Sequence, residues 1–490
     1  MHKREGFFLC ILVLLSLVSN SPSLAQSDSV IATIQVGASA LVYNSTDIKI
    51  YANKTGDSVA IIDGEGDSVI ATVKVGATPY AFAYNPTNNK IYCANQYSDN
   101  VTIIDGATNN VITTKGVGDA PRALAYNPTN NKIYCANEGD SNVTVISGEY
   151  DWVMATVNLW KFAWGPRSPR VLGYNPTDNK IYCGVSHLNI FYVPHAGSVQ
   201  IINPATDSVI ASVLVNYNPT AFAYNPQDNK IYCANSYGVS KVVTIIDGQG
   251  DSAVATVGVG DAPSALAYNS ANNKIYCANS GSNSVTIMDG EGDSMMAKVE
   301  VGDFPLALVY NPQNNKIYCA NLGSDNVTVI DGASDTVITT LGVGDAPRAL
   351  AYNSANNKIY CGGASISVIA CSPASAVEED QKTEVIPKFS LSQNYPNPFN
   401  PTTKIAFAVH SLQFAVTSPQ SRAPSPTTLV IYNLIGQKVR TLVDEPKRPG
   451  SYEVVWDGKD GKGKDVASGM YFYQLKAGDF TETKKILLLK

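Results

Sequence analysis

Histidine is the side chain most often used for acid–base and metal chemistry, and this sequence contains very little of it. Beyond the N-terminal segment the histidines are His187, His195 and His410. None stands with a serine or carboxylate in a recognisable catalytic pattern. The sequence also lacks a phosphate-cradling loop and a haem-attachment motif. We therefore predict no enzymatic activity and no bound cofactor.

Cysteine is more frequent, and seven cysteines share one position of a repeated sequence. Equivalent positions on neighbouring sheets lie roughly 10 Å apart, whereas a disulfide needs Cα atoms within about 7 Å. No CxxC or Cys/His cluster supports zinc, so we expect small buried apolar side chains. The sequence alone does not decide whether Cys361 and Cys371 form a disulfide. The seven are Cys93, Cys135, Cys183, Cys233, Cys277, Cys319 and Cys361.

Acidic strings of the form Asp-Gly-Glu-Gly-Asp, at 63–67 and 289–293, resemble calcium-binding loops. Equivalent segments at 105–109 and 331–335 replace the central residues with Ala-Thr and Ala-Ser. The ligand pattern of an EF-hand is never completed. We interpret these strings as hairpin turns and predict no metal site.

Two insertions, 158–169 and 185–198, gather aromatic and basic side chains and interrupt the repeat around its fourth copy. Aromatic residues in exposed loops suit recognition of a sugar, a peptide or another protein. The alternative is that the two loops pack on each other as a lid or plug. The candidate ligand-binding residues are Trp160, Phe162, Trp164, Arg167, His187, Phe191, Tyr192 and His195.

The elements that position these residues follow from the repeat, which has a period of 41 to 50 residues. Each copy divides into four short β-like runs separated by turn residues, the size of one propeller blade. We predict an all-β fold with an eight-bladed β-propeller at 27–370. The alternative is a seven-bladed propeller, if the degenerate first copy does not form a blade. The strand at 29–35 should complete the last blade. The copies open at Tyr43, Tyr84, Tyr126, Tyr174, Tyr224, Tyr268, Tyr310 and Tyr352.

In this propeller topology, both insertions belong to one face of the ring.

The strings YNPTNNKIYCAN at 84–95 and 126–137 and YNPQDNKIYCAN at 224–235 resemble the YVTN-type β-propeller family. The resemblance spans about 28–370 and implies the propeller fold and a cell-surface or extracytoplasmic setting. One departure is Cys at a position where that family usually has Val.

A linker at 371–388 precedes a different domain at 389–490, whose short strands predict a small immunoglobulin-like β-sandwich. The strings YPNPFNP at 395–401, IYNLIGQ at 431–437, WDG at 456–458 and ASGMYFY at 467–473 resemble the C-terminal sorting domain of type IX secretion cargo. That domain is similar to the immunoglobulin-like domain of flagellar hook-capping proteins. The resemblance implies type IX-like secretion machinery as a partner of 389–490.

The first 25 residues predict a secretory signal peptide, with a basic start, an apolar run and a small-x-small cleavage site. We expect no integral membrane segment after its removal, and a secreted or outer-surface location. The net charge is −6 although 389–490 is basic, so the body is acidic and nucleic acid is excluded as a partner. The leading hypothesis is a binding or structural propeller for a protein, peptide or glycan. The alternatives are a polymer-cleaving lyase or hydrolase and an S-layer-like structural protein.

Overall fold

The computed structural model describes residues 27–160, 167–187, 197–216, 218–236, 241–372, 390–394, 397, 399–409, 425–447, 450–478 and 480–489. The predicted signal peptide lies outside these residues, as does nearly all of the predicted linker. The chain divides into two compact units, Met1–Val377 and Glu378–Lys490. Among the described residues, no helix is long and apolar enough to cross a membrane.

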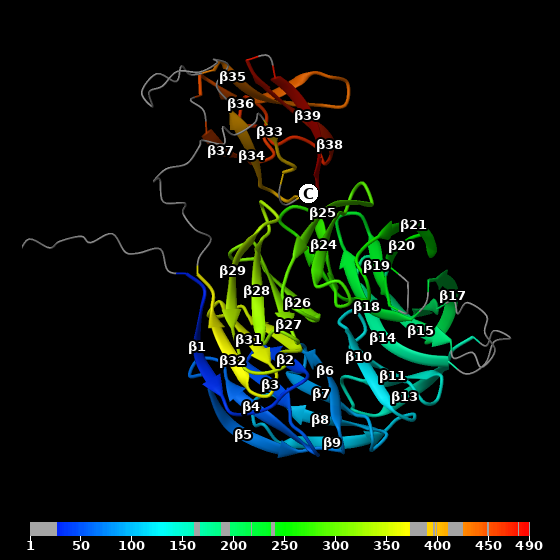
Figure 1. The fold of residues 1–490 in the computed structure, drawn as a ribbon. Helices are drawn as coiled ribbons and strands as arrows, with labels where there is room; N and C mark the ends of the chain where they lie inside the picture. Colours follow the sequence, from blue (N-terminus) through cyan, green and yellow to red (C-terminus); the bar gives the residue numbers. More distant parts are fainter. Residues whose placement is uncertain are drawn as a thin grey trace, which may run out of the picture. The chain divides into compact units, whose positions relative to one another are not determined.

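The first unit is built from eight four-stranded antiparallel sheets within the described residues 29–370 (Figure 1). Seven of them follow chain order, and we number these sheets 1 to 7. Sheet 1 is β2 (Leu41–Asn44), β3 (Lys49–Asn53), β4 (Ser58–Asp63) and β5 (Ser68–Lys74); sheet 2 is β6 (Pro79–Asn85), β7 (Lys90–Asn95), β8 (Asn100–Asp105) and β9 (Val111–Gly116); sheet 3 is β10 (Pro121–Asn127), β11 (Lys132–Asn137), β12 (Asn142–Ser147) and β13 (Val153–Asn158); sheet 4 is β14 (Arg167–Asn175), β15 (Lys180–His187), β16 (Gly197–Asn203) and β17 (Ser208–Val215). Sheet 5 is β18 (Pro219–Asn225), β19 (Lys230–Asn235), β20 (Val242–Asp247) and β21 (Ser252–Gly258); sheet 6 is β22 (Pro263–Asn269), β23 (Lys274–Asn279), β24 (Ser284–Asp289) and β25 (Ser294–Glu300); sheet 7 is β26 (Pro305–Asn311), β27 (Lys316–Asn321), β28 (Asn326–Asp331) and β29 (Val337–Gly342).

Sheet 8 closes the ring, as the sequence predicts. It combines β30 (Ala349–Asn353), β31 (Lys358–Gly362) and β32 (Ile366–Ala370) with the N-terminal β1 (Ser29–Ile34). Ser29 lies opposite Ala370 in the antiparallel β1–β32 pair. The first strand of each sheet contacts the first strand of the next, and β30 contacts β2. The fold is therefore a closed β-propeller.

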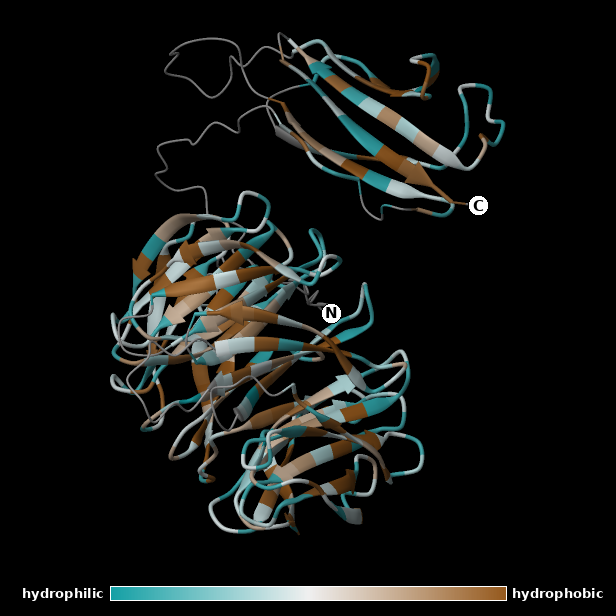
Figure 2. Cartoon of the chain, turned by 90° about the vertical axis from the view of Figure 1, so that its right-hand side faces the viewer, coloured by the Kyte–Doolittle hydropathy of each residue, from teal (hydrophilic) through white to brown (hydrophobic). Residues whose placement is uncertain are grey.

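Apolar packing between neighbouring sheets forms the core. The second and third strands are almost fully buried, and each apolar cluster combines residues of two adjacent sheets. Tyr51 and Ile61 of sheet 1, for example, pack with Ile91 and Cys93 of sheet 2. Figure 2 shows the hydrophobic residues running through these strands. Each large side chain buried in this way contributes roughly 1.5–3 kcal/mol.

Polar contacts join the same interfaces, because a lysine that begins the second strand reaches a turn residue of the next sheet. Seven junctions are ion pairs of 2.6–3.1 Å. At the eighth, Lys49 Nζ donates to Asn109 Oδ1 at 3.0 Å. The ion pairs are Lys90–Asp151, Lys132–Asp207, Lys180–Asp251, Lys230–Asp293, Lys274–Asp335, Lys316–Asp28 and Lys358–Asp67.

The outermost strand of each sheet is much less buried than the inner strands. A register shift interrupts its pairing near the start, as between Ile61 and Ile62 opposite Val69 and Ala71. The shift leaves Val69 and Ile70 both exposed. Neighbouring sheets diverge with distance from the axis, so their outer strands are not covered. The bulge also disrupts the free edge and so discourages pairing with another chain.

The second unit is a small β-sandwich. One sheet contains β33 (Ser390–Leu391), β34 (Thr403–Val409) and β37 (Gly450–Trp456). The other contains β36 (Lys438–Asp444), β35 (Thr427–Tyr432), β38 (Gly469–Ala477) and β39 (Phe480–Leu488) in that order. Trp456 is fully buried between them, and its indole N–H donates to the Lys459 carbonyl at 2.9 Å. Two facing antiparallel sheets of this kind agree with the predicted immunoglobulin-like β-sandwich.

Candidate functional site

The repeated cysteines and acidic turns are structural. All eight described cysteines are free and buried, including Cys361 and Cys371, so no disulfide joins that pair. Burial raises the pKa of Cys361 to about 12 and of Cys371 to about 11, which keeps both thiols protonated at neutral pH. In the first acidic turn, Asp63 accepts hydrogen bonds from backbone N–H groups and Asp67 pairs with Lys358. No group of three potential metal ligands occurs among the described residues.

The connections between sheets, together with those between second and third strands, form one face of the ring, here called the loop face. Both insertions begin there, but their flanks are strand rather than loop. Arg167 pairs with His187 in the backbone register of β14 and β15, extending that hairpin beyond its counterparts. The side chains of Arg167 and His187 lie outside the described structure, as do Phe162, Trp164, Phe191, Tyr192 and His195 entirely.

Trp160 is the one predicted ligand-binding side chain within the described structure, and 45% of its surface is exposed. Its backbone N–H donates to Gln200 Oε1 at 2.8 Å, and its carbonyl accepts from Gln200 Nε2 at 3.2 Å. In the connection from sheet 2 to sheet 3 the equivalent residue is Gly118, where an added Cβ would meet Asn137 at 2.8–2.9 Å. Sheet 4 has Val185 in place of that asparagine. The backbone at Trp160, where the first insertion begins, is thus held by its two hydrogen bonds to Gln200.

The residue that follows the first proline of each copy provides a second group of side chains on this face. At Pro79, Pro121 and Pro169 the strand register shifts across the next residue, which is therefore a bulge. A bulge redirects its side chain relative to the regular pleat. The residues at this position, here called the post-proline position, are Tyr80, Arg122, Arg170, Thr220, Ser264, Leu306 and Arg348, with Ser39 equivalent in the first copy.

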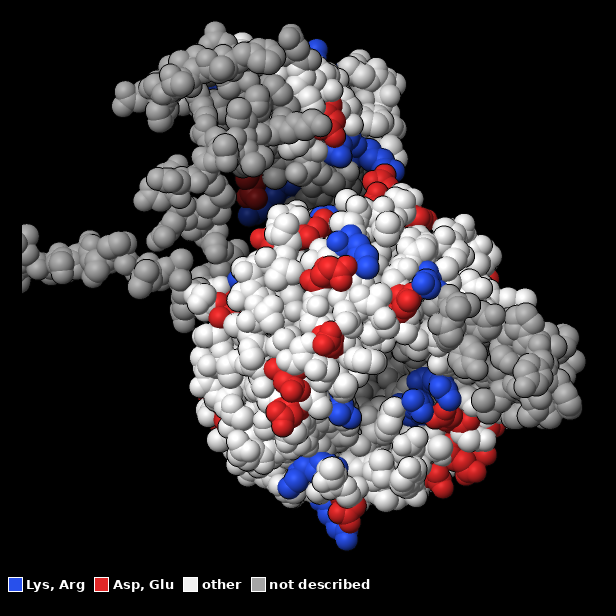
Figure 3. All heavy atoms as spheres, in the orientation of Figure 1, with Lys and Arg blue, Asp and Glu red and all other residues white. Residues whose placement is uncertain are grey.

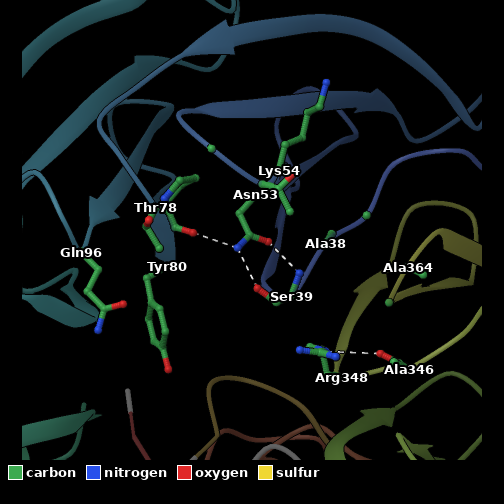
Figure 4. Close-up of a pocket in the computed structure, with 15 residues that line it drawn as sticks. Ala38, Ser39, Asn53, Lys54, Thr78, Tyr80, Gln96, Ala346, Arg348 and Ala364 are labelled. Atoms are coloured by element: carbon green, nitrogen blue, oxygen red, sulfur yellow. Dashed lines mark hydrogen bonds between the residues drawn. The ribbon is translucent and has the colours of Figure 1, made fainter.

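A cavity of about 640 Å³ lies on the loop face where sheets 8, 1 and 2 meet. Tyr80 and Arg348 lie on opposite sides of its opening, with Ser39 and Asn53 between them (Figure 4). Asn53 Nδ2 donates to Ser39 Oγ and to the Pro79 carbonyl, both at 2.8 Å, which fixes the cavity wall. This volume is in the range of small-ligand sites.

Charged side chains continue from the cavity across sheets 3 and 4. The guanidinium carbon of Arg122 lies 5.1 Å from the centre of the Tyr80 ring. Glu138 accepts from Arg122 Nη1 at 2.6 Å and pairs with Arg170 Nη2 at 2.8 Å. Arg348 is exposed, and its Nε donates to the Ala346 carbonyl at 3.3 Å. We call Arg348, Tyr80, Arg122, Glu138 and Arg170 the arginine arc.

The other side of the ring has no comparable charge at the post-proline position. Thr220 and Ser264 donate their hydroxyls to the carbonyl of the next sheet's proline, at 2.9 and 2.7 Å. On the face shown in Figure 3, charged side chains form separate groups among uncharged residues. The arc contains three guanidinium groups and one carboxylate, a composition that suits the binding of anions.

The sequence contained a signal for the arc that the search for insertions did not use. The strands of the copies are similar, but the residue directly after the first proline varies among Tyr, Arg, Thr, Ser and Leu. Glu138 likewise follows the KIYCAN string, where other copies have Gln96, Ser236 or Ser280. Variation at these two positions indicates residues that do not maintain the ring.

These observations define a closed β-propeller with a cationic, aromatic site on one face, followed by an immunoglobulin-like domain. Residues 404–479 match the FlgD Ig-like domain family. That match confirms the predicted similarity of the C-terminal domain to the hook-capping type. No curated protein sequence matches the chain significantly.

Solved structures support the propeller fold. The C-terminal WD40 domain of Sif2 is similar with a TM-score of 0.57 at 12% identity, over 71% of this chain and 99% of that one. Hydrazine synthase of Kuenenia stuttgartiensis is similar with a TM-score of 0.50 at 22% identity, over 61% of this chain and 97% of that one. At these identities the likeness extends to the fold alone.

Proposed function

We propose that this protein is an exported binding propeller, presented at the cell surface or released outside the cell. The observation that carries the proposal is the cavity between Tyr80 and Arg348 on the loop face. The two insertions begin on that same face. A protein, peptide or glycan ligand would bind there, while the Lys–Asp pairs between sheets maintain the ring.

Recognition is favoured over catalysis because the only carboxylate of the arc, Glu138, is shared by two guanidinium groups within 2.8 Å. A carboxylate engaged by two guanidinium groups is occupied in ion pairs rather than presented to a substrate. The C-terminal domain is proposed to act as a sorting or anchoring module that engages type IX-like secretion machinery. Its match to an immunoglobulin-like family supports a non-catalytic role for this domain.

The binding proposal is tested with the full mature chain on glycan and peptide arrays, in parallel with Tyr80→Ala and Trp160→Ala. We expect a specific signal that at least one of these variants loses. Tyr150→Ala is the matched control, because Tyr150 is also an exposed aromatic residue but lies in the β12–β13 turn on the opposite face. An array without signal, or a signal that all three variants retain, would contradict the proposal.

The sorting proposal is tested by comparing the cellular location of the full chain with that of a chain ending at Val377, in a bacterium with type IX secretion. The full chain should reach the surface or medium, and the shortened chain should remain in the periplasm. Equal export of both would contradict the assigned role.

A further inference from the structure

We propose that the arginine arc binds the carboxylates of an acidic glycan, a chain containing uronic acid residues. This inference rests on the proposed binding function and names its ligand class. It is carried by three features of the arc: guanidinium groups available to an anion, an exposed aromatic ring beside them, and a cavity of suitable size.

The guanidinium groups are incompletely used by the protein. The Arg348 side chain makes one described hydrogen bond, through Nε to the Ala346 carbonyl, and its two terminal nitrogens have no partner among the described residues. Arg170 Nε is buried and likewise lacks a partner among them. Buried donors are normally satisfied. Guanidinium nitrogens in a fixed planar fork match the two oxygens of a carboxylate.

The charge balance of the arc favours an anion. Arg348, Arg122 and Arg170 contribute three positive charges, and Glu138 neutralises one. The remaining positive charge stands in a propeller that is acidic as a whole, because the chain has a net charge of −6 although its C-terminal domain is basic. Lys54 lines the same cavity and adds to the positive potential. The lining residues of the cavity include these two cations, Lys54 and Arg348, and no carboxylate, and a cleft lined by one sign of charge attracts ligands of the opposite sign.

The aromatic ring favours a sugar as the carrier of the carboxylate. Tyr80 is 37% exposed, and its ring lines the cavity while Arg122 stacks over it. Such a ring offers an apolar surface with a polar tip, which suits the apolar face and hydroxyl edge of a pyranose. The cavity of about 640 Å³ accommodates a short sugar segment. An extended acidic peptide would instead need a longer groove.

The experiment uses calorimetric titration of the full mature chain with a short oligogalacturonide. The same oligomer with methyl-esterified carboxyls and an oligoglutamate peptide are the comparison ligands. We expect binding of the free acid alone, weakened by salt. Arg348→Gln and Arg122→Gln should each weaken it about tenfold or more. Arg348 is exposed, so its replacement leaves the fold intact.

Lys241→Gln is the matched control. Lys241 is an exposed cation on the loop face of sheet 5, outside the arc, and pairs with Asp261. Its replacement removes one positive charge and should change the affinity less than about twofold. Equal weakening by Lys241→Gln would show that net charge, rather than the arc, governs binding.

Three further outcomes would overturn the inference: equal binding of the methyl ester, unchanged affinity in both arginine variants, or binding of oligoglutamate in place of the sugar. The two proposals can be separated. An array signal from a neutral ligand that Tyr80→Ala abolishes would retain the binding function and refute the acidic-glycan assignment. An array without any signal would refute both.

Discussion

Asp28 is the residue whose replacement tests most directly how the ring is closed. It lies just before β1, and its carboxylate is 1% exposed against Lys316, which is 7% exposed. Both carboxylate oxygens accept from Lys316 Nζ at 3.1 Å. The Ser372 backbone N–H and hydroxyl donate to Oδ1 at 2.6 Å, and Tyr318 donates its hydroxyl to Oδ2 at 3.0 Å. One side chain therefore connects sheets 7 and 8 with both ends of the propeller.

Asp28→Ala leaves Lys316 buried without a counter-charge, and the loss of one partner from such a pair costs about 3–5 kcal/mol. Asp28→Asn should cost less, because it keeps an acceptor. The chain already contains an amide at one equivalent junction, where Asn109 accepts from Lys49. Asp67→Ala is the internal reference. Its pair with Lys358 is 13–14% exposed, so we expect a smaller loss of about 1–3 kcal/mol.

Urea unfolding of the full chain, followed by tryptophan fluorescence and circular dichroism, measures these differences. The double variant Asp28→Ala with Lys316→Met should recover part of the loss, because the uncompensated charge is removed. A stability of Asp28→Ala within about 0.5 kcal/mol of the unsubstituted protein would refute the reasoning. A cost that Lys316→Met does not reduce would show that the hydrogen bonds to Ser372, rather than the charge, close the ring.

Two further predictions concern the buried cysteines. Because all eight described thiols are buried and free, a thiol reagent should react slowly with the native chain and rapidly in urea; fast reaction in the native state would contradict their burial. Stability should also fall in alkali. The folded pKa values of Cys371 and Cys361, about 11 and 12, exceed the ordinary value of 9.0, so the unfolded chain releases its protons first. This contribution is complete below pH 9 and is lost as the pH rises to about 11 for Cys371 and about 12 for Cys361, by roughly 1 kcal/mol per pH unit for each thiol. Urea unfolding at about pH 8 and pH 10 measures the fall, and replacing both cysteines with Ala should reduce it.

Sequence periodicity was sufficient to predict the propeller because one unit specifies its own four strands. The Asn-Pro and Asp-Gly turns fix where each strand ends, and Tyr92 and its equivalents fill the interface with the next sheet. The separated strand at 29–35 was predictable as the closing strand because the last copy lacks a fourth strand. These features depend on local patterns repeated many times.

The arginine arc was not predictable in the same way, because its geometry depends on contacts between copies. Arg122 and Arg170 belong to different sheets, and only the folded ring brings both to Glu138. The strand character of Arg167 and His187 was also missed. Long insertions attract attention in a sequence, whereas a single substituted position in a regular copy does not.

The repeat itself explains why recognition can develop at the post-proline position. Positions that join neighbouring sheets must be compatible with every junction, so Lys, Tyr and the turn Asp recur almost without change. Thr220 and Ser264 still join neighbouring sheets, because each donates to the proline carbonyl of the next sheet. Where the post-proline side chain makes no such bond, it is free to vary. Arginine at three such positions then lies on one side of the ring, among sheets 8, 3 and 4. A ligand held by these side chains would bind off the axis, and its contacts would involve only part of an otherwise regular ring.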